Sequence, residues 1–242
     1  MGPGARDMAQ LAAIGIMCKA PRPGRAKTRL AATIGVEAAA KLSACFLRDV
    51  AAAIEAVPEG LACRGYGVYA PAGAEPELRA ILPPSFGLLL QADAEFGNVL
   101  HGAARDLLAV GHDCVALVNS DSPTLPSAVL AQAVEALRRP GDRMVLGPAS
   151  DGGYYLIGLK APHRHLFTNI PWGTDAVATL TLERALQIGL ETMMLPDWYD
   201  IDDAETLGWL RDELAGTSAR FKGGGLAVAT RAWLTASAMA AE

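Results

Sequence analysis

A strongly basic segment follows the first apolar stretch of the chain. Its sequence is Lys19-Ala-Pro-Arg-Pro-Gly-Arg-Ala-Lys-Thr-Arg29, which places five cations in eleven residues. Lysine and arginine side chains beside a helix start bind phosphate oxygens well, because they add charge to backbone N–H groups that already favour anions. Prolines restrict such a loop, and a glycine lets its backbone approach a ligand closely. The alternative is a solvated basic loop. We predict a phosphate-binding loop, with these candidate residues: Lys19, Pro21, Gly24, Arg25, Lys27 and Arg29.

Two common nucleotide-binding patterns are absent from this segment of the sequence. It contains no G-x-x-x-x-G-K-[ST], the pattern of the P-loop. No G-x-G-x-x-G, the dinucleotide-binding pattern, follows the first apolar stretch either. A phosphate-binding loop at this place therefore belongs to another type of site.

An acidic turn follows a second apolar run, in the sequence Val118-Asn-Ser-Asp-Ser-Pro123. A carboxylate at the end of a buried strand is costly unless it binds something. Mg²⁺ or Mn²⁺ that bridges to phosphate oxygens is its natural partner, since these ions use one or two carboxylates together with water and phosphate. The alternative is a turn or a cap for the helix expected from Ser127. Asp121 is the candidate metal ligand and catalytic residue, and Ser120 is a candidate nucleotide-binding residue.

Polar and aromatic residues gather at three later points of the sequence. Asp151-Gly152-Gly153-Tyr154 reads as a hairpin turn whose aromatic residue could line a pocket. Pro171-Trp-Gly-Thr174 precedes an expected helix, with Thr174 as a good N-cap. An acidic cluster between Asp197 and Asp203 could supply a second metal ligand. The candidates for substrate binding are Gly152, Gly153, Tyr154, Trp172, Gly173 and Thr174; Asp151 is a second catalytic candidate, and Asp200 and Asp202 are further metal candidates.

Composition argues against several other classes of protein. The 242 residues carry a net charge of -5, which is unusual for a nucleic-acid-binding protein. There is no C-x-x-C pair, no G-x-S-x-G and no metal-ligand spacing of histidines. The first apolar stretch is too short to span a bilayer and lacks the features of a secretory signal. We therefore expect a cytoplasmic protein with no membrane span and no nucleic-acid partner; the sequence allows a homodimer.

Apolar strands alternate with helical patterns through the first two thirds of the chain. Strands are expected at 11–18, 64–70, 87–91, 113–118, 143–147, 154–159 and 192–195, and helices at 36–57, 75–82, 95–110, 127–139, 174–189, 202–214 and 227–240. Alternation of this kind predicts a mostly parallel sheet covered by helices on both faces. We expect a flexible tail over 1–10, one α/β domain over 11–222, and a helical extension over 223–242 after the triple glycine.

Five segments together resemble the bacterial DUF2064 proteins, a family classed with GT-A-type glycosyltransferases in the nucleotide-diphospho-sugar transferase superfamily. The segments are KAPRPGRAKTRLA, NSDSPTLP, GPASDGGYYLIGL, IPWGT and YDIDD, in that order. The resemblance runs from about Ile14 to Leu210. It implies a three-layer αβα sandwich, a Rossmann-like GT-A fold with a mostly parallel mixed sheet.

The resemblance also implies roles for particular residues. The cations of the basic segment fall in a nucleotide-phosphate loop, and Asp121 matches a metal-binding aspartate of a DxD-like motif. Asp151 to Gly153 match a turn on the acceptor or sugar side, and Asp200 or Asp202 matches a late acidic position that completes the metal site. One departure concerns Phe96 to Leu100, where the family's glycine is kept and its arginine is lost.

The expected activity is that of a transferase with Mg²⁺ or Mn²⁺ as cofactor. A nucleotide-diphosphate sugar would be the donor, and the glycosyl group would pass to an unknown small-molecule acceptor. One alternative is nucleotidyl transfer from a nucleoside triphosphate to a phosphorylated acceptor. Another is a catalytically silent nucleotide-binding protein, since a fold does not fix an activity.

Overall fold

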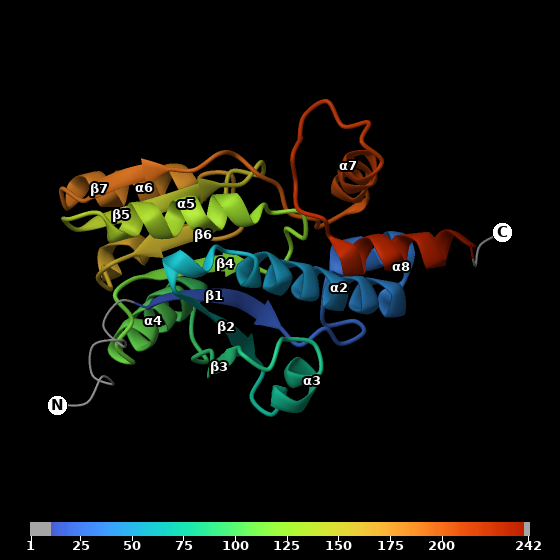
Figure 1. The fold of residues 1–242 in the computed structure, drawn as a ribbon, viewed down its shortest axis with the longest axis horizontal. Coiled ribbons are helices and arrows are strands. Elements are labelled where there is room, and N and C mark those ends of the chain that lie inside the picture. Colours follow the sequence, from blue (N-terminus) through green and yellow to red (C-terminus); the bar gives the residue numbers. More distant parts are fainter. Residues whose placement is uncertain (1–10, 240–242) are drawn as a thin grey trace.

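The computed structural model describes residues 11–239. The predicted tail over 1–10 lies outside the described residues, as do the last residues of the predicted C-terminal extension. Within the described part, strands and helices alternate and build three layers (Figure 1).

A seven-stranded sheet forms the middle layer, with the strand order β3-β2-β1-β4-β6-β5-β7. Its strands are β1 (Ala12–Lys19), β2 (Cys63–Ala70), β3 (Gly87–Leu90), β4 (Val115–Asn119), β5 (Arg143–Pro148), β6 (Tyr154–Leu159) and β7 (Glu191–Met194). Neighbouring strands are parallel except where β6 pairs with β4 and β5 in the antiparallel sense. The sheet is thus mixed and mostly parallel, as predicted.

The helices cover both faces of this sheet. They are α1 (Thr28–Ile34), α2 (Val36–Glu55), α3 (Glu75–Arg79), α4 (Phe96–Ala109), α5 (Ser127–Arg138), α6 (Val177–Gln187), α7 (Ala204–Leu214) and α8 (Val228–Met239), with 3-10 turns at Glu59–Leu61 and Arg164–Phe167. One core joins α2, α5 and α7 to the sheet, and a second core on the other face joins α4 and α6 to it.

Strand β1 shows why the two cores form. Its residues alternate between the faces, so Ile14 and Ile16 enter the first core while Ala13 enters the second. Both isoleucines are fully buried. A strand with apolar residues on both faces must lie in the middle of a covered sheet. It therefore carries its last residue, Lys19, to the centre of the sheet's carboxyl edge.

The differences from the predictions include one missed helix and two helices that begin later than expected. Helix α1 was not predicted, because prolines and charges precede it and it is only seven residues long. Helix α6 begins at Val177 rather than at Thr174, which closes a turn by donating to the carbonyl oxygen of Pro171 at 2.9 Å. Helix α7 begins after Asp203, whose side chain accepts from the backbone N–H of Thr206 in a capping box.

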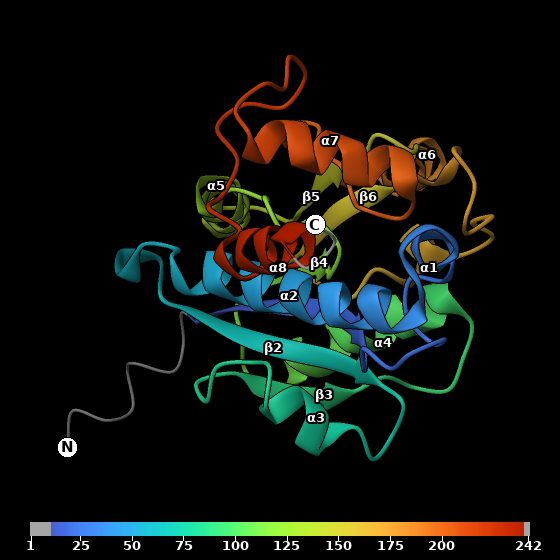
Figure 2. The ribbon, with the colours of Figure 1, turned by 90° about the vertical axis from the view of Figure 1, so that its right-hand side faces the viewer.

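Helix α8 lies beside α2 (Figure 2). The buried carboxylate of Asp49 on α2 accepts from the backbone N–H groups of Ala229 and Thr230 at 2.9 and 2.8 Å. This contact fixes the start of α8. The division of the chain at the triple glycine stays a proposal. None of the described helices has the length and hydrophobicity that crossing a bilayer would require.

Candidate active site

A cleft of about 480 Å³ opens at the carboxyl edge of the sheet. In an open α/β sheet this edge is the usual place for ligands. The ends of β1 and β4, the loop before α1, the helices α1, α2 and α4, and the segments after β3 and before α7 contribute its lining. The lining residues are Met17, Cys18, Lys19, Arg25, Ala26, Lys27, Thr28, Arg29, Ser43, Gln91, Phe96, Asn119, Ser120, Asp121 and Asp202. The basic segment and the acidic turn, ninety residues apart in sequence, therefore face one another as predicted.

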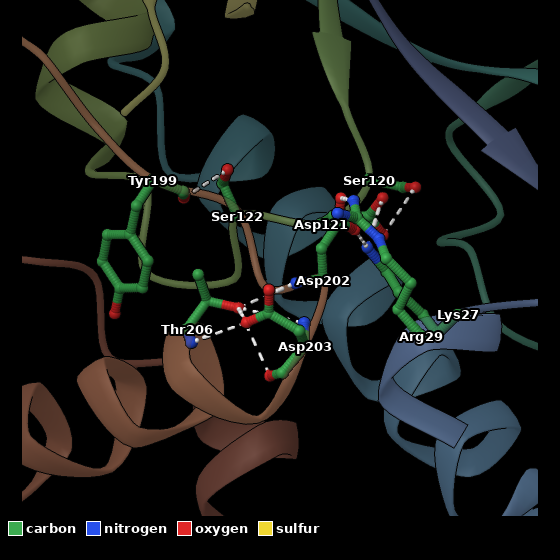
Figure 3. Close-up of polar contacts among 9 residues, drawn as sticks. All are labelled: Lys27, Arg29, Ser120, Asp121, Ser122, Tyr199, Asp202, Asp203 and Thr206. Atoms are coloured by element: carbon green, nitrogen blue, oxygen red, sulfur yellow. Dashed lines mark hydrogen bonds and ion pairs between the residues drawn. The ribbon is translucent and has the colours of Figure 1, made fainter. Parts of the chain in front are cut away.

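Lys27 lies between two carboxylates of the cleft (Figure 3). Its Nζ atom is 2.7 Å from Asp121 Oδ2 and 2.6 Å from Asp202 Oδ1, and its side chain is only 6% exposed. Lys27 is the N-cap of α1 and has a left-handed backbone, with φ of 50°. That conformation is rare for residues other than glycine and carries a cost, which often marks a functional position.

The two aspartates are fixed by backbone contacts that do not involve Lys27. The carbonyl oxygen of Asp121 accepts from the backbone N–H of Ile201 at 3.0 Å. Beside it, the Ser122 hydroxyl donates to the carbonyl oxygen of Tyr199 at 2.8 Å. The backbone N–H of Asp202 donates to the Thr206 hydroxyl at 3.0 Å. The turn after β4 is thus joined to the segment before α7, which sets the spacing of the carboxylates.

Every carboxylate oxygen of this pair has a partner. Besides Lys27, Asp121 accepts from the Ser120 hydroxyl at 3.2 Å, and Asp202 accepts from Arg29. Burial raises the pKa of Asp202, but the charges of Lys27 and Arg29 outweigh it and hold that pKa below its usual range.

Asp200 behaves in the opposite way. Burial raises its pKa to about 7, and the neighbouring charges of Asp202 and Asp151 add to the effect. The charge of Lys27 lowers the pKa of Asp200, but Lys27 forms its ion pairs with Asp121 and Asp202 instead. Asp200 does not line the cleft, although its electrostatic coupling to Asp121 places it near the same acidic cluster.

The remaining cations of the loop divide into two groups. Lys19 and Arg25 line the cleft with exposed side chains, and no ion pair within residues 11–239 engages either of them. Arg22 points elsewhere and pairs with Glu77 at 2.6 Å. The first two therefore keep their hydrogen-bond donors for a ligand. Pro21 and Gly24 shape the loop, Gly24 with φ of 70°, but do not line the cleft.

Uncharged polar and aromatic side chains also line the cleft. Gln91 donates from Nε2 to the carbonyl oxygens of Val68 and Cys18 at 2.7 and 3.3 Å, so its Oε1 is left for a ligand. The buried Oδ1 of Asn119 has no partner within the described chain. Phe96 lines the same cleft and is 48% exposed. Sequence reasoning missed Gln91, Asn119 and Phe96 as site residues; the polar residue directly after the third strand was the signal for Gln91.

The predicted substrate-binding residues lie outside the cleft lining. Asp151, Gly152 and Gly153 form the turn between β5 and β6, where a Cβ at Gly152 would meet the backbone of Asp175 at 2.2 Å. Trp172 packs edge-on against Phe96, with ring centroids 5.0 Å apart.

The other members of that group are placed as follows. The Tyr154 hydroxyl is buried without a partner within residues 11–239, and burial raises its pKa. Gly173 and Thr174 are exposed in the turn before α6. Their substrate-binding roles stay predictions.

The donor set of the cleft suits a divalent cation chemically. Carboxylate oxygens are the ligands that Mg²⁺ and Mn²⁺ prefer, and the Lys27 ammonium shows that the space between Asp121 and Asp202 accepts a positive charge. Within residues 11–239, no three or more His, Cys, Asp or Glu side chains are grouped as a ready-made metal site. A metal would have to compete with Lys27 for both carboxylates and with Arg29 for Asp202.

Comparison with known structures supports this fold. Over 94% of the chain and 95% of the other, the structure is similar to a protein of Desulfovibrio desulfuricans G20 provisionally described as a nucleotide-diphospho-sugar transferase, with 28% identity and a TM-score of 0.78. At 11% identity it shares its fold with CMP:2-keto-3-deoxy-manno-octonic acid synthetase complexed with CTP, covering 86% and 100% of the two chains with a TM-score of 0.57. A nucleotidyl transferase from Methanothermobacter thermautotrophicus shares the fold at 18% identity, covering 84% and 96% with a TM-score of 0.53.

Sequence comparison gives the family. No curated protein matches the chain. The model of a family described as "Uncharacterized protein conserved in bacteria (DUF2064)" matches residues 53–174, and with them the turn that carries Asp121. The fold is that of the nucleotide-sugar transferase and nucleotidyltransferase superfamily. The chain belongs to the DUF2064 family.

Proposed function

We propose that this protein is a metal-dependent glycosyltransferase that takes a nucleotide-diphosphate sugar as donor. The observation that carries the proposal is the mixed lining of the cleft. Asp121, Lys27 and Asp202 line it together with the uncharged Gln91 and the aromatic Phe96. A nucleotide combines the same two kinds of group, a charged diphosphate and an uncharged aromatic base.

The diphosphate has suitable partners among the charged residues that line the cleft. Lys19 and Arg25 offer donors that no carboxylate engages within the described chain, and arginine can hold two phosphate oxygens at once. Asp121 and Asp202 are the residues that would hold Mg²⁺ or Mn²⁺. The ion, when bound, would neutralise the charge that develops on the departing diphosphate.

The base has suitable partners among the uncharged residues that line the cleft. Gln91 presents an acceptor to a base N–H group, while its Nε2 is fixed by two main-chain carbonyls. The exposed ring of Phe96 offers an apolar surface for an aromatic base.

The acceptor would enter from the side of the turn between β5 and β6. Asp151 at this turn is exposed and close enough to Asp200 to raise its pKa. A carboxylate there could take the proton that an acceptor hydroxyl loses during transfer. This is the role we assign to Asp151.

Nucleotidyl transfer is the second candidate. The fold neighbours include a synthetase complexed with CTP and a nucleotidyl transferase, and the same cleft could place a triphosphate. Release of pyrophosphate from a nucleoside triphosphate would identify this reaction, whereas release of a nucleoside diphosphate from a nucleotide sugar would identify glycosyl transfer.

The test is calorimetry with UDP-, GDP- and ADP-linked sugars, each with and without Mn²⁺. The proposal predicts that at least one binds, that Mn²⁺ tightens it, and that Asp121→Ala weakens the Mn²⁺-dependent part at least tenfold. Equal binding by Asp121→Ala and wild type would exclude the metal role. Binding without turnover over a broad set of acceptors would indicate a nucleotide-binding protein without catalytic activity.

A further inference from the structure

The ammonium of Lys27 takes up the place between the two carboxylates that would hold a divalent cation. Its Nζ atom lies 2.7 Å from one and 2.6 Å from the other, which are short charge-assisted distances. The side chain is 6% exposed, so water screens this contact only slightly. A second cation of higher charge cannot enter the same space while the ammonium remains there.

The backbone that carries the two carboxylates is held by contacts that do not involve Lys27. Asp121 is fixed through its carbonyl oxygen to Ile201, and Asp202 is fixed through its N–H to Thr206. Only the long, flexible side chain of Lys27 would have to move for the space to open. The carboxylates belong to the frame, and the ammonium is the exchangeable partner.

A phosphate group would give Lys27 a new partner nearby. Lys19 and Arg25 line the same cleft as Lys27. A diphosphate bound between these two cations would lie within the space that the Lys27 side chain also lines. Lys27 could then exchange its carboxylate partners for phosphate oxygens without becoming an unpaired buried charge, which would be costly.

We propose that the Lys27 ammonium and a divalent cation compete for Asp121 and Asp202, so that Lys27 keeps the metal site closed until a diphosphate draws it away. This inference rests on the proposed metal dependence. It adds that cation binding depends on the diphosphate: the cation binds weakly alone and tightly together with the diphosphate.

The direct test is a calorimetric titration with Mn²⁺ alone, with no nucleotide present. Lys27→Met removes the competing charge and should bind Mn²⁺ at least tenfold more tightly than wild type, because a unit charge beside both carboxylates is lost. Lys27→Arg keeps the charge and should bind as weakly as wild type. Arg29→Met is the matched control, since Arg29 contacts Asp202 only and its side chain is 70% exposed; its effect should be much smaller.

A second measurement uses the unaltered protein, in case Lys27→Met does not fold. The NMR signal of the Lys27 side-chain methylene beside Nζ, assigned with Lys27→Arg, should shift when Mg²⁺ and a diphosphate are added together. A signal that stays in place while both bind would overturn the exchange.

The outcomes separate the two proposals. Measurable and equal Mn²⁺ binding by wild type and Lys27→Met would overturn the competition and leave the metal site standing. Mn²⁺ binding by neither protein would overturn the metal dependence itself, and with it the competition.

Discussion

Two settings of buried or half-buried carboxylates can be compared in this molecule. Asp49 is 6% exposed and accepts from two backbone N–H groups at the start of α8. Asp121 and Asp202 have side chains 27% and 31% exposed and share the side-chain ammonium of Lys27 in an open cleft. The carboxylates have hydrogen-bond or ion-pair partners in both places, but the partners of Asp49 are backbone groups and the shared partner of Asp121 and Asp202 is a side chain.

The comparison separates structural carboxylates from functional ones. Backbone N–H groups at a helix start cannot leave without unwinding the helix, so Asp49 is committed to the fold. A lysine side chain can rotate away while its backbone stays in place, so the cleft carboxylates can change partners. The predictions that follow test this difference, from the largest expected effect to the smallest.

The largest effect is expected at the structural carboxylate. Asp49→Ala removes the acceptor of the part-buried N–H of Ala229 and the buried N–H of Thr230, and should lower the free energy of unfolding by about 3 kcal/mol. Urea denaturation followed by circular dichroism measures it. Mn²⁺ binding by the folded fraction should not change. A loss of metal binding with unchanged stability would reverse the assignment of the two settings.

The next effect concerns Asp200 and depends on pH. Its pKa in the folded protein is about 7, above the ordinary value of 3.8. In the unfolded chain the Asp200 carboxyl ionises near pH 4. Between pH 4 and pH 7 the folded protein therefore keeps a proton on Asp200 that the unfolded chain has lost, and the free energy of unfolding falls as the pH rises. Asp200→Asn should match wild type near pH 4 and be more stable by about 2 kcal/mol at pH 8, allowing for partial exposure.

Chelator-treated protein should be used for that comparison, with thermal unfolding at several pH values. A stability difference that stays constant from pH 4 to pH 8 would show that folding does not raise the pKa of Asp200. It would also remove the contrast with Asp202, whose pKa lies below its usual range.

A smaller effect is expected at the open cations of the cleft. Arg25→Ala should weaken binding of a nucleoside diphosphate about tenfold, or about 1.4 kcal/mol, and leave the unfolding free energy unchanged. Arg25 lines the cleft with an exposed side chain and supports no helix or strand. Calorimetry with the same nucleotides measures the binding, and unchanged affinity would remove Arg25 from the phosphate site.

The smallest effect is expected at Arg22, three residues before Arg25. Arg22→Ala removes an exposed ion pair with Glu77 and should leave the free energy of unfolding almost unchanged, because water screens such a pair. Nucleotide affinity should stay as in wild type, which makes this variant the matched control for Arg25→Ala. An affinity loss as large as that of Arg25→Ala would mean that the loop acts through its overall charge rather than through particular contacts.

The sequence predicted the frame of the site better than its contacts. Apolar runs marked β1 and β4 clearly, and the carboxyl-edge rule then brought Lys27 and Asp121 to one place. The hairpin that makes β6 antiparallel followed from Asp151 and Gly152.

The contacts depend on features that no local pattern contains. The residues around Lys27 do not predict its left-handed backbone. That conformation occurs where the Lys27 side chain contacts Asp202, which is 175 residues away in the sequence. Gln91 became a site residue only because two main-chain carbonyls of neighbouring strands orient its amide. Both depend on tertiary packing.

The central claim is that the charged cleft holds a metal-bound diphosphate. Crystals soaked with Mn²⁺ and a nucleoside diphosphate test it most directly, through the anomalous signal of manganese. The account predicts a manganese peak in contact with Asp121 and Asp202, the diphosphate on Lys19, Lys27 and Arg25, and the base beside Gln91. A diphosphate bound elsewhere, or a Lys27 still held between both carboxylates with manganese at another place, would contradict it.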